Sequence, residues 1–120
     1  MKVLLADDHS AIRQRLKQIL LEAYPTSQIE EVADGEGLIR QALAQRWDLV
    51  IADIRMPAVT GLEALRHIRS AHPHLPVLLI SSFRQEEYAH VAIRAGASAY
   101  LCKEEAHDEL IPAIQRLTVV

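Results

Sequence analysis

The stretch Leu49-Val50-Ile51-Ala52-Asp53 places four consecutive apolar residues directly before an aspartate. A short continuous run of Val, Ile and Leu is typical of a strand that is buried on both faces of a parallel sheet. The run at 29–33 is more polar, because two glutamates interrupt it, and we expect it to form an edge strand. Three further runs have the continuous apolar character, at residues 3–6, 77–80 and 99–102.

Stretches with helical spacing separate these five runs. Thr60 and Glu63 have the spacing of a capping box, which predicts the start of one helix. The alternation of strands and helices predicts an α/β fold, in which right-handed crossovers place helices on both faces of a parallel sheet. We expect a single domain over residues 1–120, since no linker or low-complexity segment divides the chain. Residues on one face of the first helix illustrate the spacing: Ile12, Leu16, Ile19 and Leu20.

The composition restricts the function classes. The 120 residues include 13 Lys and Arg against 16 Asp and Glu, which excludes a strongly basic domain that binds nucleic acid by charge alone. The single cysteine, Cys102, excludes an internal disulfide and fits a reducing compartment. No apolar run approaches the ~20 residues that cross a bilayer, and the N-terminus lacks a signal-peptide pattern. We therefore expect a cytoplasmic protein that makes no membrane contact.

Charged and hydroxyl side chains follow the predicted strands: Asp7, Asp8, Asp53, Ser81 and Lys103. Sites in an open parallel sheet form beyond the carboxyl ends of the strands, so these groups are expected to meet at one edge. Mg²⁺ relieves repulsion between crowded carboxylates, since it prefers oxygen ligands and binds carboxylates together with phosphate. An aspartate can also accept phosphate as a mixed anhydride. The residues predict Mg²⁺-assisted phosphorylation of an aspartate, although Asp7 or Asp8 taken alone is equally typical of a helix cap or a solvated loop.

The spacing of these residues, together with Met56, Pro57 and Gly61, resembles the receiver domain of two-component response regulators over essentially the whole chain. Residues 4–9 and 94–101 resemble the NarL/FixJ (LuxR-type) branch of that family. The resemblance implies a flavodoxin-like (βα)5 three-layer sandwich whose parallel five-stranded sheet has the order 2-1-3-4-5. Proteins of that branch join the receiver to a helix-turn-helix DNA-binding output domain, which we expect to be absent from residues 1–120.

The resemblance implies that Asp53 is the phosphoacceptor and attacks the phosphohistidine of a sensor histidine kinase. It further implies a Mg²⁺ ion, with Mn²⁺ as an alternative, bound by Asp7, Asp8, Asp53 and the backbone carbonyl of Arg55. Asp7 would bind the ion either directly or through water. Lys103 would contact a carboxylate of the cluster before phosphorylation and the phosphoryl oxygens after it.

The resemblance also implies a switch and a guarded phosphoryl group. The Ser81 hydroxyl would bond the phosphoryl group, and the Tyr100 ring would turn inward in response. Simple strand termination by Ser81 and ordinary sheet packing by Tyr100 are the alternative interpretations. Arg55 and Phe83 occupy positions that control access of water to the phosphoryl group, so we predict slow autodephosphorylation.

The starts of the last and the first helix carry residues with more than one role. We expect the last helix to start near His107 with Ala106 as a weak N-cap, which places Pro112 inside the helix. A proline there removes one hydrogen bond and favours a kink, which puts in doubt any interface built on this helix. We expect His9 to begin the first helix, and a response to the charge of the neighbouring aspartates is the alternative interpretation.

Two other function classes compete with a phosphorylated switch. A Mg²⁺-dependent phosphatase or phosphotransferase usually carries Asp-x-Asp after the first strand, whereas here Asp7 and Asp8 are followed by His9. A nucleotide-binding module needs a glycine-rich loop at that place, and the first glycine is Gly35. We therefore expect a phosphoacceptor rather than an enzyme with a separate substrate. Its expected partners are a sensor histidine kinase and, on phosphorylation, a second copy of the chain, with DNA contacted only through the output domain.

Overall fold

The computed structural model describes residues 1–82 and 86–118. Within these residues, five strands alternate with five α-helices, and a 3₁₀ turn precedes the last helix. None of the described helices is both long enough and apolar enough to cross a membrane. In chain order the elements are β1 (Lys2–Ala6), α1 (Ser10–Ala23), β2 (Gln28–Val32), α2 (Gly35–Ala44), β3 (Leu49–Asp53), α3 (Gly61–Ala71), β4 (Val77–Ser81), α4 (Glu86–Arg94), β5 (Ala99–Cys102), the 3₁₀ turn η1 (Lys103–Glu105) and α5 (Ala106–Thr118).

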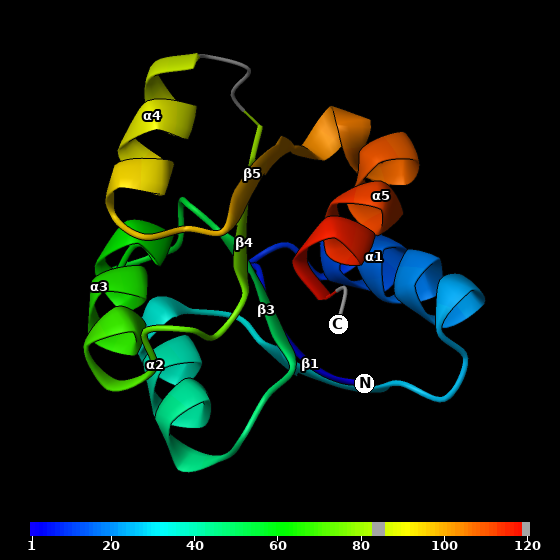
Figure 1. Ribbon diagram of the computed structural model, residues 1–120, viewed down its shortest axis with the longest axis horizontal. Helices are drawn as coiled ribbons and strands as arrows, with labels where there is room; N and C mark the ends of the chain where they lie inside the picture. The colour runs from blue at the N-terminus through cyan, green and yellow to red at the C-terminus, as the bar shows by residue number, and fades with distance from the viewer. Residues whose placement is uncertain (83–85, 119–120) are drawn as a thin grey trace.

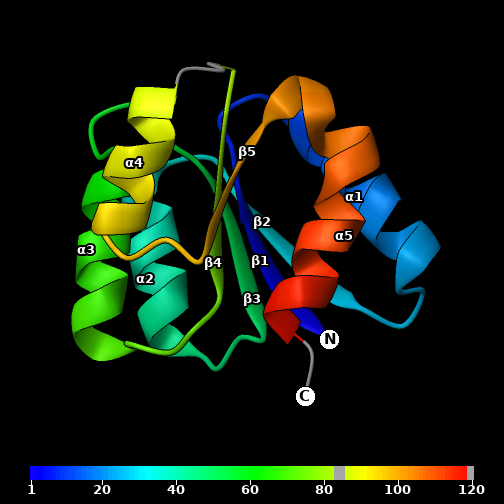
Figure 2. The ribbon, with the colours of Figure 1, turned by 45° about the horizontal axis from the view of Figure 1, so that its top comes forward.

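The five strands form one parallel sheet with the order β2-β1-β3-β4-β5. Helices α2, α3 and α4 cover one face of the sheet, while α1 and α5 cover the other (Figures 1 and 2). The predicted flavodoxin-like fold and its strand order are therefore confirmed. The same crossovers carry the carboxyl ends of all five strands to one edge of the sheet.

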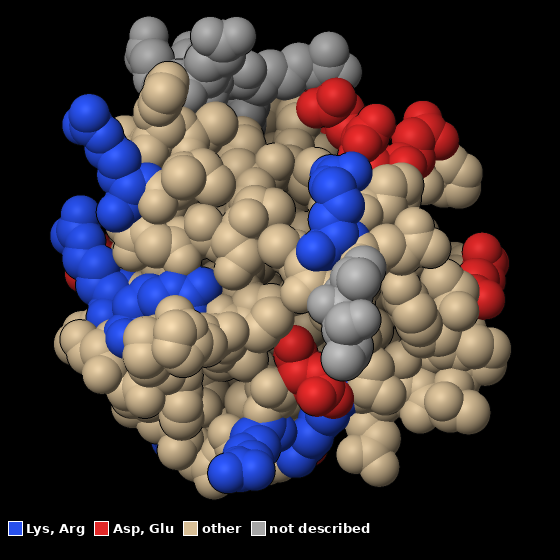
Figure 3. Space-filling model, viewed as in Figure 1, with Lys and Arg blue, Asp and Glu red and all other residues tan. Residues whose placement is uncertain are grey.

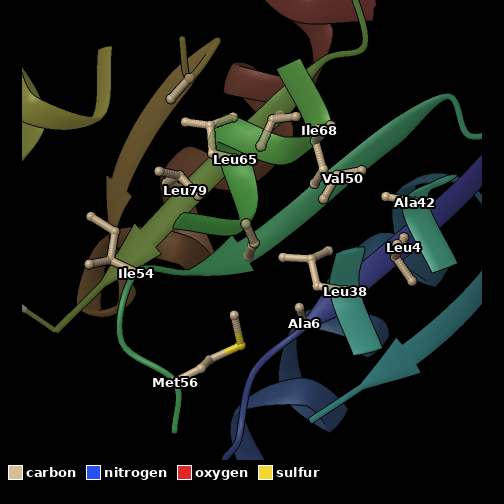
Figure 4. Close-up of a cluster of buried hydrophobic side chains, with 14 of the residues drawn as sticks. Leu4, Ala6, Leu38, Ala42, Val50, Ile54, Met56, Leu65, Ile68 and Leu79 are labelled. Carbon is tan, nitrogen blue, oxygen red and sulfur yellow. The ribbon is translucent and has the colours of Figure 1, made fainter. Parts of the chain in front are cut away.

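The buried strands divide their side chains between two cores, which explains why their apolar runs are continuous. In β1, Leu4 and Ala6 belong to the core under α2 and α3, which Figure 4 shows, whereas Val3 and Leu5 belong to the core under α1 and α5. Successive strand residues point to opposite faces, so a strand covered on both sides needs apolar residues throughout. Strand β2 has an exposed or half-buried residue at every position, as expected for the predicted edge strand.

Local hydrogen bonds confirm the predicted cap of α3. The Thr60 hydroxyl oxygen accepts a bond of 3.1 Å from the backbone N–H of Glu63, which completes one half of the predicted capping box. Gly61 then allows an unusually close approach, because a Cβ atom at this position would lie 2.1 Å from the backbone oxygen of Asp53. The start of α3 is thereby held against the end of β3.

The start of the last helix differs from the prediction by one residue. Ala106 is the first residue of α5 rather than its N-cap, so the helix begins one residue before His107. The reason is the 3₁₀ turn η1, whose Lys103 carbonyl accepts the N–H of Ala106 and leads the chain directly into the helix. Pro112 does lie inside α5, and the helix continues past it to Thr118.

Candidate functional site

The carboxyl ends of β1 and β3 lie side by side at the centre of the sheet. The chain leaves β1 toward α1 on one face and leaves β3 toward α3 on the other, which is the arrangement at which ligand sites form in open parallel sheets. In Figure 2 this edge of the sheet lies toward the top. Asp7 follows β1 directly, while Asp53 is the last residue of β3 rather than the first residue after it. Asp53 still pairs with Ile80 of β4, so the ladder extends one residue beyond the apolar run.

Asp53 is almost completely buried, with 4% of its surface exposed. Its Oδ2 atom accepts a hydrogen bond of 2.8 Å from Nζ of Lys103, and its Oδ1 atom accepts one of 3.1 Å from the backbone N–H of Arg55. Burial raises the pKa of Asp53, and Lys103 and the Arg55 N–H oppose this rise without cancelling it. The carboxylate is thus held in a fixed orientation in a poorly hydrated site.

Lys103 joins the two buried aspartates of the site. Its Nζ atom lies 2.9 Å from Oδ2 of Asp7 as well as 2.8 Å from Oδ2 of Asp53. Burial lowers the pKa of Lys103, but the contacts with Asp53 and Asp7 outweigh burial, so the pKa is raised overall and the ammonium persists. One cation therefore faces two buried carboxylates at the sheet edge.

The donor atoms at this edge fit a divalent cation. Asp7, Asp8, His9 and Asp53 each offer one ligand atom, and these atoms all lie within 4.8 Å of one another. Oδ2 of Asp7 is buried and has no aligned hydrogen-bond donor in residues 1–82 and 86–118, although Lys103 Nζ is close. A buried carboxylate oxygen in this condition is suited to a metal ion. Because oxygen atoms dominate the donor set, Mg²⁺ or Mn²⁺ fits the site.

His9 and Arg13 also contact the acidic residues, and Arg13 was not among the predicted site residues. His9 is the N-cap residue of α1, as predicted, and its Nδ1 atom also lies 3.2 Å from Oδ1 of Asp7 and 3.1 Å from Oδ1 of Asp8. Arg13, the fourth residue of α1, donates a hydrogen bond to the backbone oxygen of Asp7. The sequence does contain a signal that points to Arg13. A cation near the positive end of a helix dipole is locally unfavourable, which indicates a role in the tertiary structure.

The two predicted switch residues lie on neighbouring strands. Ser81 is the last residue of β4, not the residue after it, and 1% of its surface is exposed. It is paired in register with Cys102, which directly precedes Lys103. Tyr100 is half-buried on β5 and packs against the core under α2 and α3. Both residues therefore lie on strands that end at the site.

The structure describes one of the two residues predicted to control access of water, Arg55. Arg55 is exposed on the loop after β3, directly beside the Asp53 carboxylate that its N–H contacts. Phe83 lies outside the described residues. The loop between Asp53 and α3 also contains Ala58 at a positive φ of 63°, a conformation that costs a residue with a Cβ atom about 1 kcal/mol.

Comparison with known proteins agrees with this geometry. A family model described as the response regulator receiver domain matches residues 3–115. YxjL of Bacillus subtilis, an uncharacterized transcriptional regulatory protein, is 34% identical over 114 residues, which is 95% of this chain and 52% of that protein. NreC of Staphylococcus epidermidis, an oxygen regulatory protein, is 31% identical over 116 residues, which is 96% of this chain and 53% of that protein. The chain spans about half the length of the curated relatives it matches.

Solved structures match along nearly the whole chain. A LuxR-family two-component response regulator from Aurantimonas sp. SI85-9A1 has 30% identity and a TM-score of 0.89, covering 98% of this chain and 84% of that chain. The chemotaxis response regulator CheY4 of Vibrio cholerae has 30% identity and a TM-score of 0.86, covering 97% of each chain. The predicted family and branch are confirmed. This chain belongs to the response regulator receiver domain family of two-component systems, in its NarL/FixJ (LuxR-type) branch.

Proposed function

We propose that the chain is a phosphorylation-dependent switch in which Asp53 accepts a phosphoryl group from the phosphohistidine of a sensor histidine kinase. The observation that carries this proposal is the buried contact of Asp53 and Asp7 with one ammonium, at 2.8 and 2.9 Å from Lys103 Nζ. A nucleophile held beside a fixed cation, at the carboxyl edge of the sheet, suits attack on a phosphoryl group.

The proposed cation site consists of Asp7, Asp8, Asp53 and the backbone carbonyl of Arg55. A Mg²⁺ or Mn²⁺ ion bound there offsets the negative charge of the carboxylates and of an incoming phosphoryl group. The fully buried Asp7 supports this assignment, since one of its oxygens has no aligned donor in the described part of the chain. Lys103 contributes a second positive charge on the Asp53 side of the cluster.

The proposed transfer forms one bond and breaks one. A carboxylate oxygen of Asp53 attacks phosphorus, while the phosphorus–nitrogen bond of the phosphohistidine breaks and its electron pair returns to the imidazole nitrogen. The product is an aspartyl phosphate, a mixed anhydride. In this proposal, Lys103 exchanges part of its contact with the carboxylate for contact with a phosphoryl oxygen. The Arg55 N–H, 3.1 Å from Oδ1, helps to hold the carboxylate in place during the attack.

The proposed response runs through Ser81 and Tyr100. Ser81 ends β4, the strand next to β3, and directly follows Ile80, which pairs with Asp53; in this proposal its hydroxyl bonds a phosphoryl group on Asp53. New charge and hydrogen bonds then bias an element with two states, which is how a local modification acts at a distance. We further propose that Arg55 and Phe83 limit the access of water, so that autodephosphorylation is slow.

The output of the switch is part of the proposal. YxjL and a DegU of Brevibacillus brevis are described as transcriptional regulatory proteins, and this chain spans 52% and 48% of them. We propose control of transcription through a DNA-binding domain outside this sequence, together with a phosphorylation-linked homodimer. A cytoplasmic location, which the single cysteine favours, goes with this function.

Intact mass spectrometry after incubation with acetyl phosphate tests the phosphoacceptor. We expect one added phosphoryl group on the wild type with Mg²⁺, and none without Mg²⁺ or on Asp53→Asn. Asp108→Asn is the matched control, because Asp108 is an exposed aspartate on the first turn of α5. An adduct that persists on Asp53→Asn would overturn the assignment. If the folded wild type gains no mass, binding of beryllofluoride distinguishes rapid loss of phosphate from a site that does not accept it.

A further inference from the structure

Arg13 connects three parts of the protein behind the acidic site. Its Nη1 atom donates a hydrogen bond of 2.5 Å to the backbone oxygen of Asp7, and its Nε atom donates one of 3.2 Å to Oε1 of Glu31. The side chain is largely buried, with 18% of its surface exposed. Arg13 thereby joins helix α1, the loop that carries Asp7, and the edge strand β2.

The position of this cation opposes the local preference of a helix start. The described helices α2, α3 and α5 have acidic residues in their first turns, and Figure 3 shows the acidic group over the start of α5. Helix α1 has none, its N-cap His9 makes no side-chain cap bond, and Arg13 lies where the helix dipole is positive. The contacts with Glu31 and the Asp7 carbonyl offset this unfavourable placement.

The backbone of Asp7 is held from both sides. Its N–H donates a hydrogen bond of 3.2 Å to the backbone oxygen of Val32, at the end of β2. Its carbonyl accepts the bond from Arg13, which Glu31 of the same strand orients. The two peptide groups that flank the Asp7 side chain are therefore both tied to β2, either directly or through Arg13. This restricts the direction in which the buried carboxylate points.

We propose that Arg13, oriented by Glu31, is a positioning residue that sets the cation affinity of the site by fixing Asp7. This inference rests on the proposed function, since it assigns to Asp7 a role in binding Mg²⁺. It adds two residues that do not touch the ion, Arg13 and Glu31. A ligand held in place beforehand binds a metal more tightly than one that must be ordered on binding.

The sign of the effect separates positioning from simple charge. The positive charge of Arg13 repels a divalent cation, so a role through charge alone predicts tighter Mg²⁺ binding when the residue is removed. Positioning predicts the opposite, because the Asp7 peptide then gains freedom. Lysine at this position keeps the charge but loses the planar fork that reaches the Asp7 carbonyl and Glu31 together.

Isothermal titration of the phosphate-free chain with Mg²⁺ tests the proposal. We expect the dissociation constant to rise about 10-fold for Arg13→Ala, at the low end of the range typical of groups that orient metal ligands. A smaller factor is expected for Arg13→Lys and Glu31→Gln. Lys17→Ala is the matched control. Lys17 lies on the same helix with its Nζ atom 3.6 Å from Oε2 of Glu31, and within residues 1–82 and 86–118 it makes no contact with Asp7, so we expect less than a 2-fold change.

Urea unfolding of each variant measures stability separately, so that affinity is compared between folded proteins. If Arg13→Ala, Arg13→Lys and Glu31→Gln unfold more easily but bind Mg²⁺ like the wild type, the positioning role is overturned. Tighter binding by Arg13→Ala would overturn it as well. A folded wild type that binds no Mg²⁺ would instead overturn the proposed cation site, and this inference with it.

Discussion

Replacing Lys103 by methionine removes the cation that contacts both buried aspartates while keeping most of the aliphatic side chain. Asp7 is fully buried and the Asp53 side chain is 5% exposed, so both carboxylates would then lie in a poorly hydrated site without their ammonium. Removing one partner of a buried ion pair costs about 3–5 kcal/mol, because the remaining charge is left uncompensated. We expect Lys103→Met to lose about 3 kcal/mol of unfolding free energy at pH 7.5 without Mg²⁺.

The loss is expected to depend on pH in a definite direction. The contacts with Lys103 lower the pKa of Asp53, so removing Lys103 raises that pKa further above its ordinary value. A carboxyl whose pKa is higher in the folded state stabilises the protein at low pH, and this contribution is lost as pH rises through the folded pKa. The variant is therefore expected to be closest to the wild type near pH 4 and furthest from it above neutrality. Mg²⁺ binding to the folded state adds stability. It is expected to add more to the variant than to the wild type, because the variant lacks the Lys103 ammonium, whose positive charge repels the ion.

Urea unfolding followed by fluorescence measures this loss. Trp47 is the single tryptophan and lies before β3, at the opposite end of that strand from Asp53, so its signal reports global unfolding. Lys17→Met is the control, because Lys17 pairs with Glu31 at 3.6 Å while 41% of its side chain is exposed, and exposed pairs contribute about 0–1 kcal/mol. An equal loss for Lys103→Met at pH 4 and pH 7.5, insensitive to Mg²⁺, would show that Lys103 acts only through packing.

Three further substitutions test contacts and helix geometry elsewhere in the fold and at the start of α3. Arg69→Met removes hydrogen bonds of 2.6 Å to Gly96 O and 2.6 Å to Leu75 O, so a loss of about 2–4 kcal/mol is expected in urea, against under ~0.5 kcal/mol for the exposed Arg66→Met. Gly61→Ala places a Cβ atom against the Asp53 carbonyl, and we expect slower phosphorylation by acetyl phosphate with a loss of about 1–3 kcal/mol; wild-type rates would contradict the clash. Pro112→Ala restores a helix N–H inside α5, and a gain of about 1–3 kcal/mol in thermal unfolding is expected; a loss would show that the ring packs favourably.

Much of the fold could be predicted because its signals are local. The continuous apolar run before Asp53 specifies a strand covered on both faces, and the polar run at 29–33 specifies an edge. The cap at Thr60 depends on residues within one turn. The predicted start of α5 is one residue too late. The helix is preceded by a 3₁₀ turn that is closed by a hydrogen bond to the Lys103 carbonyl, and no sequence pattern distinguishes this turn from the helix that follows.

The members of the acidic site followed from the amino-acid sequence, since Asp7, Asp53 and Lys103 each come at the carboxyl end of a strand and parallel strands end at one edge. Only the tertiary structure decided how these groups contact one another. Lys103 meets Asp53 across 50 residues of sequence, and Arg13 reaches the Asp7 carbonyl from a helix whose local preferences oppose a cation at that point. Distances, burial and the resulting pKa shifts depend on several elements packing together, and no local pattern encodes that packing.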